Sequence, residues 1–384
     1  MKSNYKRIGD YIRVVDKRNS DLSVDNLLGL SITKEFVPSV ANTVGTDMSK
    51  YKVVKRNQFV CSTMQVRRDK KMPVALLQHI DQGIISPAYY VFEVIDENIL
   101  HPEYLMMWFS RTEFDREACF YAIGGVRGSL EWEDFCDMKL PIPCIGKQRE
   151  IVKEYKTIIS RIQSNELMIE KLEYLSQSIF KENFIDDENE SKSKLEDICT
   201  IGSSKRIYFD EYTNAGIAFY RGSEVSLEKK GLPIKDKLYI SNERYNDIKN
   251  KFGVPVFGDL LLTAVGTIGE SWFVDKEEFY FKDGNVIWFR DFKNKDMNYY
   301  IYLWMQSENF KEVIKDLTIG STQSAITIKD LSQVGIMIPE KSKLDKYMEM
   351  YKKILNKIII TKNINTKLRE VNNILLSKIA SMGE

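Results

Sequence analysis

The stretch KQREIVKEYKTIISRIQSNELMIEKLEYLSQSIFKENF, residues 147–184, decides how the rest of the chain is organised. Apolar residues recur in it at alternating intervals of four and three, and a spacing near 3.5 residues is typical of a helix with a narrow seam for a partner helix. A helix of this length spans about 55 Å at 1.5 Å per residue. The predicted seam comprises Ile151, Tyr155, Ile158, Ile162, Asn165, Ile169, Leu172, Ser176 and Ile179.

The same seam returns when 196 is added to each residue number. Its second copy comprises Tyr347, Tyr351, Ile354, Ile358, Thr361, Asn365, Leu368, Asn372 and Leu375. The identical pairs are Tyr155/Tyr351, Ile158/Ile354, Ile162/Ile358 and Leu172/Leu368. The sequence therefore predicts two equal helical rods. The alternative is two ordinary amphipathic helices, each packed on a separate globular core.

The region before each rod is also repeated, which predicts the domain organisation. At the offset of 196, the matches are Tyr104/Tyr300, Trp108/Trp304, Phe114/Phe310, Asp134/Asp330 and Ile142-Pro143/Ile338-Pro339. Farther upstream the copies diverge, and residues 57–62 align with 259–264 only at a shifted offset. We expect an α+β protein with two repeated mixed α/β domains separated by two long helices. The predicted segments are domains at 1–146 and 194–341, rods at 147–184 and 342–384, and a polar linker at 185–193.

Composition limits the function classes. The chain has 384 residues, 43% of them hydrophobic, which suits two or three folded domains. No run of 18 apolar residues exists and the start lacks the apolar core of a secretion signal, so we expect no membrane contact. The five cysteines form no Cys-x-x-Cys pair and indicate reduced thiols in a cytoplasmic protein. With a net charge of +1, nucleic-acid binding would need local basic patches.

Motifs of known enzymes are missing from the sequence. It contains no nucleotide-phosphate loop, no Gly-x-Gly-x-x-Gly and no Asn-Pro or Asp-Pro pair of an amino-methyltransferase. The two histidines, His79 and His101, have no second metal ligand at helical spacing. Residues 275–282 lack the acid-x-lysine pattern of a metal-dependent nuclease, and we interpret them as a solvated hairpin. We therefore expect no catalytic residue, metal or cofactor in this chain.

Basic residues cluster in the first domain between Lys50 and Lys71, where only one acid, Asp69, interrupts them. Arginine can bind guanine edges through two parallel hydrogen bonds, whereas lysine binds phosphates as a point charge. The alternative is a merely solvated loop. The candidate DNA contacts in this cluster are Lys55, Arg56, Arg67, Arg68, Lys70 and Lys71.

A glycine-rich loop at Gly124–Ser129 adds Arg127, and its counterpart in the second copy is Gln323. Arginine prefers guanine and glutamine prefers adenine in the major groove, so this exchange fits two readers of different sequence. The alternative is a tight turn that needs glycine for its backbone. Weaker candidates in the second domain are Lys205, Arg206, Arg221 and Thr267.

Together these features resemble the specificity (S) subunit of Type I restriction-modification systems. The resemblance covers essentially the whole chain and is carried by the 123–129 loop, Asp134, Leu140–Pro143 and the Lys147–Val152 entry into the rod, with their second copies. It implies two target-recognition domains and two helices packed as an antiparallel coiled coil. One departure is Glu340–Asp345, which lacks the usual Glu-Gln before the second rod.

The resemblance also implies what the chain binds. The expected partners are double-stranded DNA with a bipartite gapped target, two methyltransferase (M) subunits and, where one exists, a restriction (R) subunit. S-adenosylmethionine is expected on the methyltransferase subunits and not on this chain. Full overlap of antiparallel rods predicts Asn165 opposite Thr361 at the centre. Alternatives from other classes are a coiled-coil protein-interaction adaptor without DNA reading, and an enzyme with an unfamiliar site.

Overall fold

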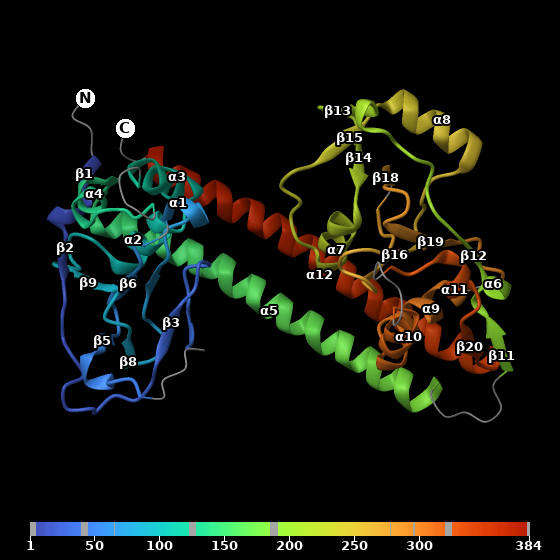
Figure 1. Cartoon of the computed structure of the whole chain (residues 1–384), viewed down its shortest axis with the longest axis horizontal. Coiled ribbons are helices and arrows are strands. Elements are labelled where there is room, and N and C mark those ends of the chain that lie inside the picture. Colours follow the sequence, from blue (N-terminus) through green and yellow to red (C-terminus); the bar gives the residue numbers. More distant parts are fainter. Residues whose placement is uncertain are drawn as a thin grey trace. The chain divides into compact units, whose positions relative to one another are not determined.

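The computed structural model describes residues 5–39, 45–64, 66–122, 128–184, 191–276, 278–294, 296–318 and 325–381. The chain divides into two compact units, one made of residues 1–161 and 369–384 and the other of residues 162–368. The boundaries fall inside the long helices α5 (Ile145–Phe184) and α12 (Lys341–Ser381), so both helices contribute to both units (Figure 1).

The first unit is built on a four-stranded antiparallel sheet of order β2-β9-β6-β7. Phe59 and Phe92 of this sheet share a buried core with Tyr104 and Trp108 of α2, because α2 covers that face. The elements are β1 (Tyr5–Arg7), β2 (Ile12–Val14), β3 (Leu28–Leu30), β4 (Phe36–Pro38), β5 (Lys52–Lys55), β6 (Phe59–Cys61), α1 (Val66–Asp69), β7 (Val74–Leu76), β8 (Gln82–Ile85), β9 (Tyr90–Val94), α2 (Pro102–Phe109), α3 (Thr112–Tyr121), α4 (Trp132–Asp137) and β10 (Lys139–Pro141).

The second unit repeats this sheet as β12-β19-β16-β17 and adds a second sheet of order β13-β15-β14-β18. Residues 279–281, predicted as part of a solvated hairpin, form the buried strand β18, which runs parallel to β14. The elements are β11 (Ser191–Lys194), α6 (Leu195–Ile198), β12 (Thr200–Gly202), β13 (Tyr212–Thr213), β14 (Ile217–Tyr220), α7 (Gly222–Lys230), β15 (Leu238–Ile240), α8 (Asn242–Phe252), β16 (Leu260–Thr263), β17 (Ser271–Phe273), β18 (Phe279–Phe281), β19 (Val286–Arg290), α9 (Met297–Met305), α10 (Glu308–Thr318), α11 (Ile328–Ser332) and β20 (Gly335–Ile338).

Equivalent hydrogen bonds show that the two units share one scaffold. The Tyr104 hydroxyl donates to the Pro141 carbonyl at 3.0 Å, and the Tyr300 hydroxyl donates to the Met337 carbonyl at 2.8 Å. Both acceptors lie on the strands that close their units, β10 against β1 and β20 against β11. Because β11 begins at Ser191, the end of the predicted linker belongs to the second unit.

The central strands align one residue away from the predicted alignment. Phe59 pairs with Phe92 in the first unit, and Leu260 pairs with Phe289 in the second. All four residues lie in the cores beneath α2 and α9, so Phe59 corresponds to Leu260. The sequence alignment paired Phe59 with Leu261, which faces the opposite side of its sheet. Side chains alternate between the faces of a strand, so a shift of one residue exchanges core and outer faces.

The long helices pair antiparallel, as predicted. In the second unit the Asn165 amide donates to the Asn365 side-chain oxygen at 2.7 Å, and the Phe184 and Tyr347 rings are 5.5 Å apart. Residue numbers therefore rise along α5 while they fall along α12. In the first unit, Ile151 of α5 and Ile379 of α12 lie in the same buried core.

The pairing is displaced by one helical turn from the predicted register. Asn165, Thr361 and Asn365 are all buried, but Asn165 bonds to Asn365 and not to Thr361. An amide offers both donors and an acceptor, whereas the Thr361 hydroxyl already donates to the Lys357 carbonyl of its own helix at 2.7 Å. Other seam residues are buried (Ile151, Ile162, Tyr351, Ile358) or half-buried (Tyr155, Ile158, Leu172, Ile354, Leu368).

None of the helices in the described residues combines the length and the apolar character needed to cross a bilayer.

Candidate nucleic-acid interface

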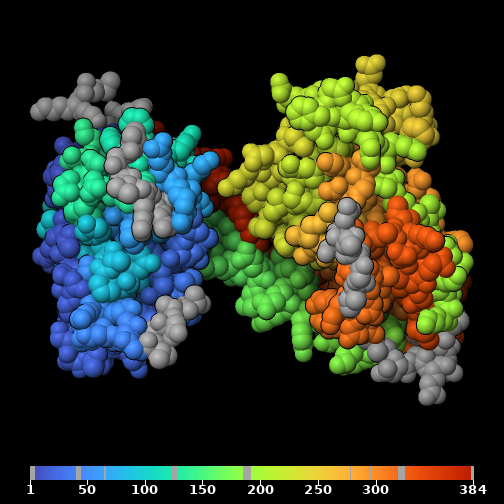
Figure 2. All heavy atoms as spheres, viewed as in Figure 1, coloured from blue at the N-terminus to red at the C-terminus, as the bar shows by residue number. Residues whose placement is uncertain are grey.

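In the first unit, four residues of the predicted basic cluster, Arg67, Arg68, Lys70 and Lys71, lie on the connection between β6 and β7. Lys55 instead ends β5 and Arg56 lies in the turn before β6, so the structure does not place these two on the same connection. We call this connection, residues 62–64 and 66–73, the α1 loop. Val66 is fully buried and its carbonyl accepts a hydrogen bond from the Cys119 thiol at 3.4 Å, which ties the loop to α3. Arg67, Arg68 and Lys70 point outward and are exposed, as is Lys71. Figure 2 shows this light-blue segment at the surface of the first unit.

The end of the glycine-rich loop packs directly against the α1 loop. The Arg67 backbone N–H donates to the Gly128 carbonyl at 3.1 Å, and the Leu130 N–H donates to the Thr63 carbonyl at 2.9 Å. Gly128 has a φ of +68°, and a Cβ there would lie 2.8 Å from the Arg67 Cβ, so the position requires glycine. Arg127 lies outside the described residues. The structure thus joins two predicted candidate regions into one surface.

The predicted cations of the first unit differ in their partners. Arg68 pairs with the adjacent Asp69 at 2.7 Å, and Arg56 pairs with the exposed Asp81 at 2.8 Å. Exposed pairs of this kind contribute about 0–1 kcal/mol, so DNA phosphates could replace them at little cost. Within the described part of the chain, no carboxylate lies within ion-pair distance of Arg67, Lys70, Lys71 or Lys55.

The second unit carries an equivalent loop after β16, residues 264–270, which we call the Gly266 loop. The Ala264 carbonyl accepts a hydrogen bond from the Ile326 N–H at 3.2 Å, as Thr63 accepts from Leu130. Thr263 holds the loop closed, because its hydroxyl donates to the Thr267 carbonyl and accepts from the Glu270 N–H. Thr267 is exposed, and its hydroxyl oxygen lies 3.1 Å from that of Ser226. Gln323 lies outside the described residues.

The remaining candidates of the second unit already have internal contacts. The Lys205 ammonium lies 4.5 Å from the centre of the Phe252 ring, and Arg206 pairs with Asp283 at 2.9 Å. Arg221 donates to the buried Glu224 at 2.6 Å, and this hydrogen bond raises the pKa of the arginine. Arg221 therefore stabilises the start of α7, and the structure does not bring these three residues into the Gly266 loop.

Two exposed aromatic residues next to the α1 loop were missed by the sequence analysis. Phe120 and Tyr121 end α3 and are 67% and 43% exposed, with ring centres 5.6 Å apart. They follow Cys119, which contacts the α1 loop. Exposed aromatic rings beside cations are typical of nucleic-acid surfaces, because every base has a face that can stack. The signal in the sequence was Phe-Tyr immediately before the glycine-rich loop, off the buried stripe of Phe114 and Ala118.

A buried ion pair in the first unit has a structural explanation. Lys34 and Asp115 are 2.8 Å apart with side chains only 8% and 11% exposed, and burial lowers the pKa of Lys34. The lysine also donates to the Phe109 carbonyl, and Asp115 accepts from the Met72 N–H at 3.1 Å. These bonds tie the β3–β4 hairpin to the scaffold helices beside a cavity of about 600 Å³. Among the described residues, no group of three His, Cys, Asp or Glu side chains could hold a metal ion.

A family model described as the Type I restriction modification DNA specificity domain matches residues 187–370. This part of the chain is a Type I specificity domain. The match begins before β11 and ends within α12, so the specificity domain includes the Gly266 loop and most of the second long helix. The resemblance predicted from the sequence is thereby confirmed.

Individual relatives agree with this family. A putative type I restriction enzyme specificity subunit of Haemophilus influenzae is 26% identical over 254 residues, or 62% of each chain. The chain thus spans about 62% of the length of this curated relative. The crystal structure of a Type-I restriction-modification system S subunit from M. genitalium matches with a TM-score of 0.59 at 14% identity, over 99% of both chains. This solved structure supports the fold of repeated mixed α/β domains and long helices.

Proposed function

We propose that this chain is the DNA sequence-specificity subunit of a Type I restriction-modification complex and reads a bipartite, gapped target with its two recognition domains. The observation that carries this proposal is the equivalence of the α1 loop and the Gly266 loop. Each loop follows the same strand of the shared scaffold and is bonded to the same neighbouring segment, through Thr63 in one unit and Ala264 in the other. A specificity domain covers the second of these loops.

In this mechanism, charge and sequence are read by different groups. Lys70 and Lys71 neutralise phosphates, which gives affinity that does not depend on sequence. Arg67 lies where the α1 loop meets the end of the glycine-rich loop, so we expect its guanidinium to read base edges there. The two units differ in the side chains at these loops, and each would therefore select its own half-site. The helix pair, which contributes residues to both units, would set the length of the unread stretch between the half-sites.

The chain would act without catalysis of its own, as a scaffold for two methyltransferase subunits and, where one exists, a restriction subunit. S-adenosylmethionine would bind to the methyltransferase subunits. Apolar residues exposed on the long helices support such docking, because large exposed apolar side chains mark interaction surfaces. In the second unit they include Leu167 (51% exposed), Tyr174 (75%), Ile360 (46%) and Ile364 (40%). The same surface favours the adaptor alternative, in which the chain binds proteins but no DNA.

Mapping of methylated bases in the host genome, with and without this gene, tests the proposal. We expect the gene to be required for methylation of one asymmetric sequence with a fixed gap. A continuous methylated site would contradict the two-domain mechanism, and no gene-dependent methylation would contradict the function.

Salt dependence of DNA binding by the assembled methyltransferase complex separates the reader from the adaptor. The double variant Lys70→Ala/Lys71→Ala should lower the slope of log affinity against log salt by about two, one unit for each lost phosphate contact. The matched control is Lys6→Ala/Lys139→Ala, which removes the same charge from exposed positions on β1 and β10. Equal slopes for both double variants would place the phosphates elsewhere, and binding without salt dependence would favour the adaptor.

A further inference from the structure

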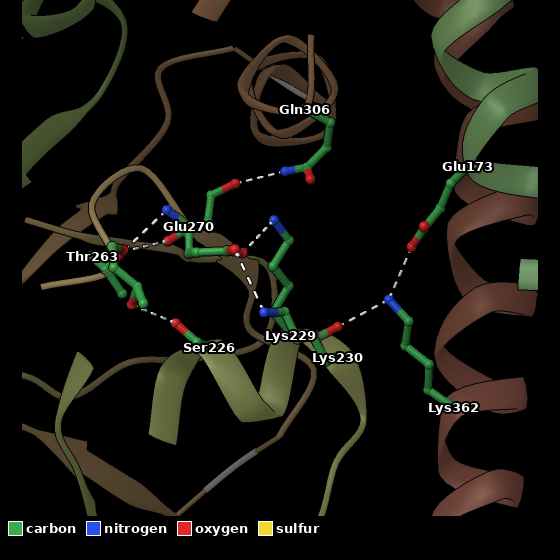
Figure 3. A network of polar contacts seen from close by, with 10 residues as sticks. Glu173, Ser226, Lys229, Lys230, Thr263, Glu270, Gln306 and Lys362 are labelled. Carbon is green, nitrogen blue, oxygen red and sulfur yellow. Dashed lines mark hydrogen bonds and ion pairs between the residues drawn. The ribbon is translucent and has the colours of Figure 1, made fainter. Parts of the chain in front are cut away.

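Lys362 joins three elements within the second unit. Its ammonium donates to the Lys229 carbonyl at the end of α7 at 2.9 Å and to Glu173 of α5 at 3.1 Å (Figure 3). The lysine side chain is only 18% exposed, whereas Glu173 is 55% exposed. One turn farther along α12, the Thr366 hydroxyl donates to the Gly231 carbonyl at 3.2 Å. Because the last carbonyls of a helix lack partners within it, two side chains of α12 cap the end of α7.

Gly231 allows this close approach between α7 and α12. It ends α7 in the left-handed conformation, with a φ of +62°. A Cβ at this position would lie 2.9 Å from the Lys362 Cβ and 3.2 Å from its Cγ. Glycine is therefore required twice, once for the backbone and once for the contact.

The opposite side of α7 contacts the Gly266 loop. Glu270 forms ion pairs with Lys229 at 2.8 Å and with Lys230 at 3.7 Å (Figure 3). Ser226 of α7 meets Thr267 at the exposed tip of the loop, with 3.1 Å between the hydroxyl oxygens. Burial opposes ionisation of Glu270, but its bonds to the two lysines hold the pKa of its carboxyl below the usual value. Helix α7 thus connects the candidate recognition loop to the helix pair.

We propose that Lys362 is a positioning residue for DNA recognition, which fixes the angle of the second recognition domain on the helix pair and thereby the gap that the complex accepts. The inference rests on the proposed function. Lys362 has no contact with DNA in this mechanism. It acts through α7, which carries any rotation of the helix pair to the Gly266 loop.

The effect is measured as the ratio of affinities for two duplexes. Both carry the half-sites found by methylation mapping, one with the natural gap and one with a gap changed by one base pair, and the protein is the assembled methyltransferase complex. Lys362→Met keeps the length of the side chain and removes its ammonium. We expect the ratio to fall by about tenfold, because one charge-assisted hydrogen bond can add no more to discrimination than its own free energy. Lys362→Arg should restore most of the ratio.

Two further variants separate positioning from folding. Gly231→Ala breaks the same contact from α7 and should lower the ratio in the same direction. Lys367→Met removes a charge from an exposed position of the same helix and should leave the ratio unchanged. An unchanged ratio of affinities in Lys362→Met would overturn the inference, even where the affinity for both duplexes falls equally. Should the wild-type complex itself show no preference for a gapped site, the proposed function would fail and the inference with it.

Discussion

The buried amide pair of Asn165 and Asn365 makes a quantitative prediction about the helix pair. Both side chains are nearly inaccessible, at 3% and 2% exposed, and one hydrogen bond of 2.7 Å joins them. Replacement of one asparagine by leucine leaves the other amide buried without this partner, which costs about 1–3 kcal/mol. Replacement of both removes the polar groups together and should be neutral or stabilising.

A double-mutant cycle isolates this energy. The added apolar surface of each leucine appears in the single and double variants alike and cancels in the cycle. The two singles together should lose about 2–6 kcal/mol to unpaired amides, whereas the double variant should lose almost none of it. We therefore expect a coupling energy of at least about 2 kcal/mol, or roughly 4–8 °C in Tm for a unit of this size. Urea unfolding followed by helix circular dichroism measures it.

The same variants should lose specificity for one gap length even where they gain stability. A polar pair in an apolar seam specifies register at some cost in stability. The double leucine variant, although at least as stable, should methylate sites with more than one gap length, because its helices can shift by a turn. A coupling energy near zero would show that the amides do not recognise each other. A stable double variant with one sharp gap would show that register is set elsewhere, for example by the Phe184 and Tyr347 rings.

Two further predictions concern the first unit. The His101 imidazole accepts a hydrogen bond from the Glu103 N–H at the start of α2, and burial lowers the pKa of this imidazole. Neutral His101 therefore contributes stability that is fully present above about pH 6.5, the pKa of an unfolded histidine, and this stability is lost as the pH falls through the lowered pKa of the folded state. His101→Asn, which can cap without titrating, should flatten the loss of Tm between pH 7.5 and pH 5, whereas His79→Asn should not. Asp115→Ala leaves the Lys34 ammonium buried without a counter-ion, with only the Phe109 carbonyl as partner, and should cost about 3–5 kcal/mol in urea unfolding. A loss below about 1 kcal/mol would contradict a buried pair.

The shared scaffold could be predicted from sequence because its packing needs the same residues twice. Tyr104 and Tyr300 each bury a ring and reach one carbonyl on the closing strand, and no other residue type offers both an aromatic ring and a hydroxyl of that reach. The seams were visible for a similar reason, since their period is set by helix geometry. The register of the two long helices could not be predicted from the sequence, because the partner of Asn165 depends on whether Thr361 or Asn365 still has a free donor or acceptor.

Residues between the shared elements could not be placed from the sequence. The segment between β2 and β6 forms the β3–β4 hairpin and β5, which pairs antiparallel with β8. The corresponding segment between β12 and β16 forms β13, β14, α7, β15 and α8, and β14 pairs parallel with β18. Strand direction depends on a partner far away in the sequence. The internal pairing of Arg206 was not predictable for the same reason, because its acid, Asp283, is far away in the sequence. Arg221 is different, since Glu224 lies only three residues further on and this local pair could have been recognised.

These two insertions are anchored differently, and this difference has a consequence for how each domain is oriented. In the first unit, Lys34 ties the hairpin to α3 through Asp115, within the recognition domain itself. In the second unit, Gly231 and Lys362 tie α7 to the helix pair. Loss of the first anchor should therefore loosen a domain without changing its orientation, so that Asp115→Ala lowers stability at a constant gap. Loss of the second through Lys362→Met should change the gap with a smaller loss of stability, because Glu173, its ion-pair partner, is 55% exposed and stays solvated. Equal effects of both variants on the gap would mean that orientation is a property of the whole domain and not of one contact.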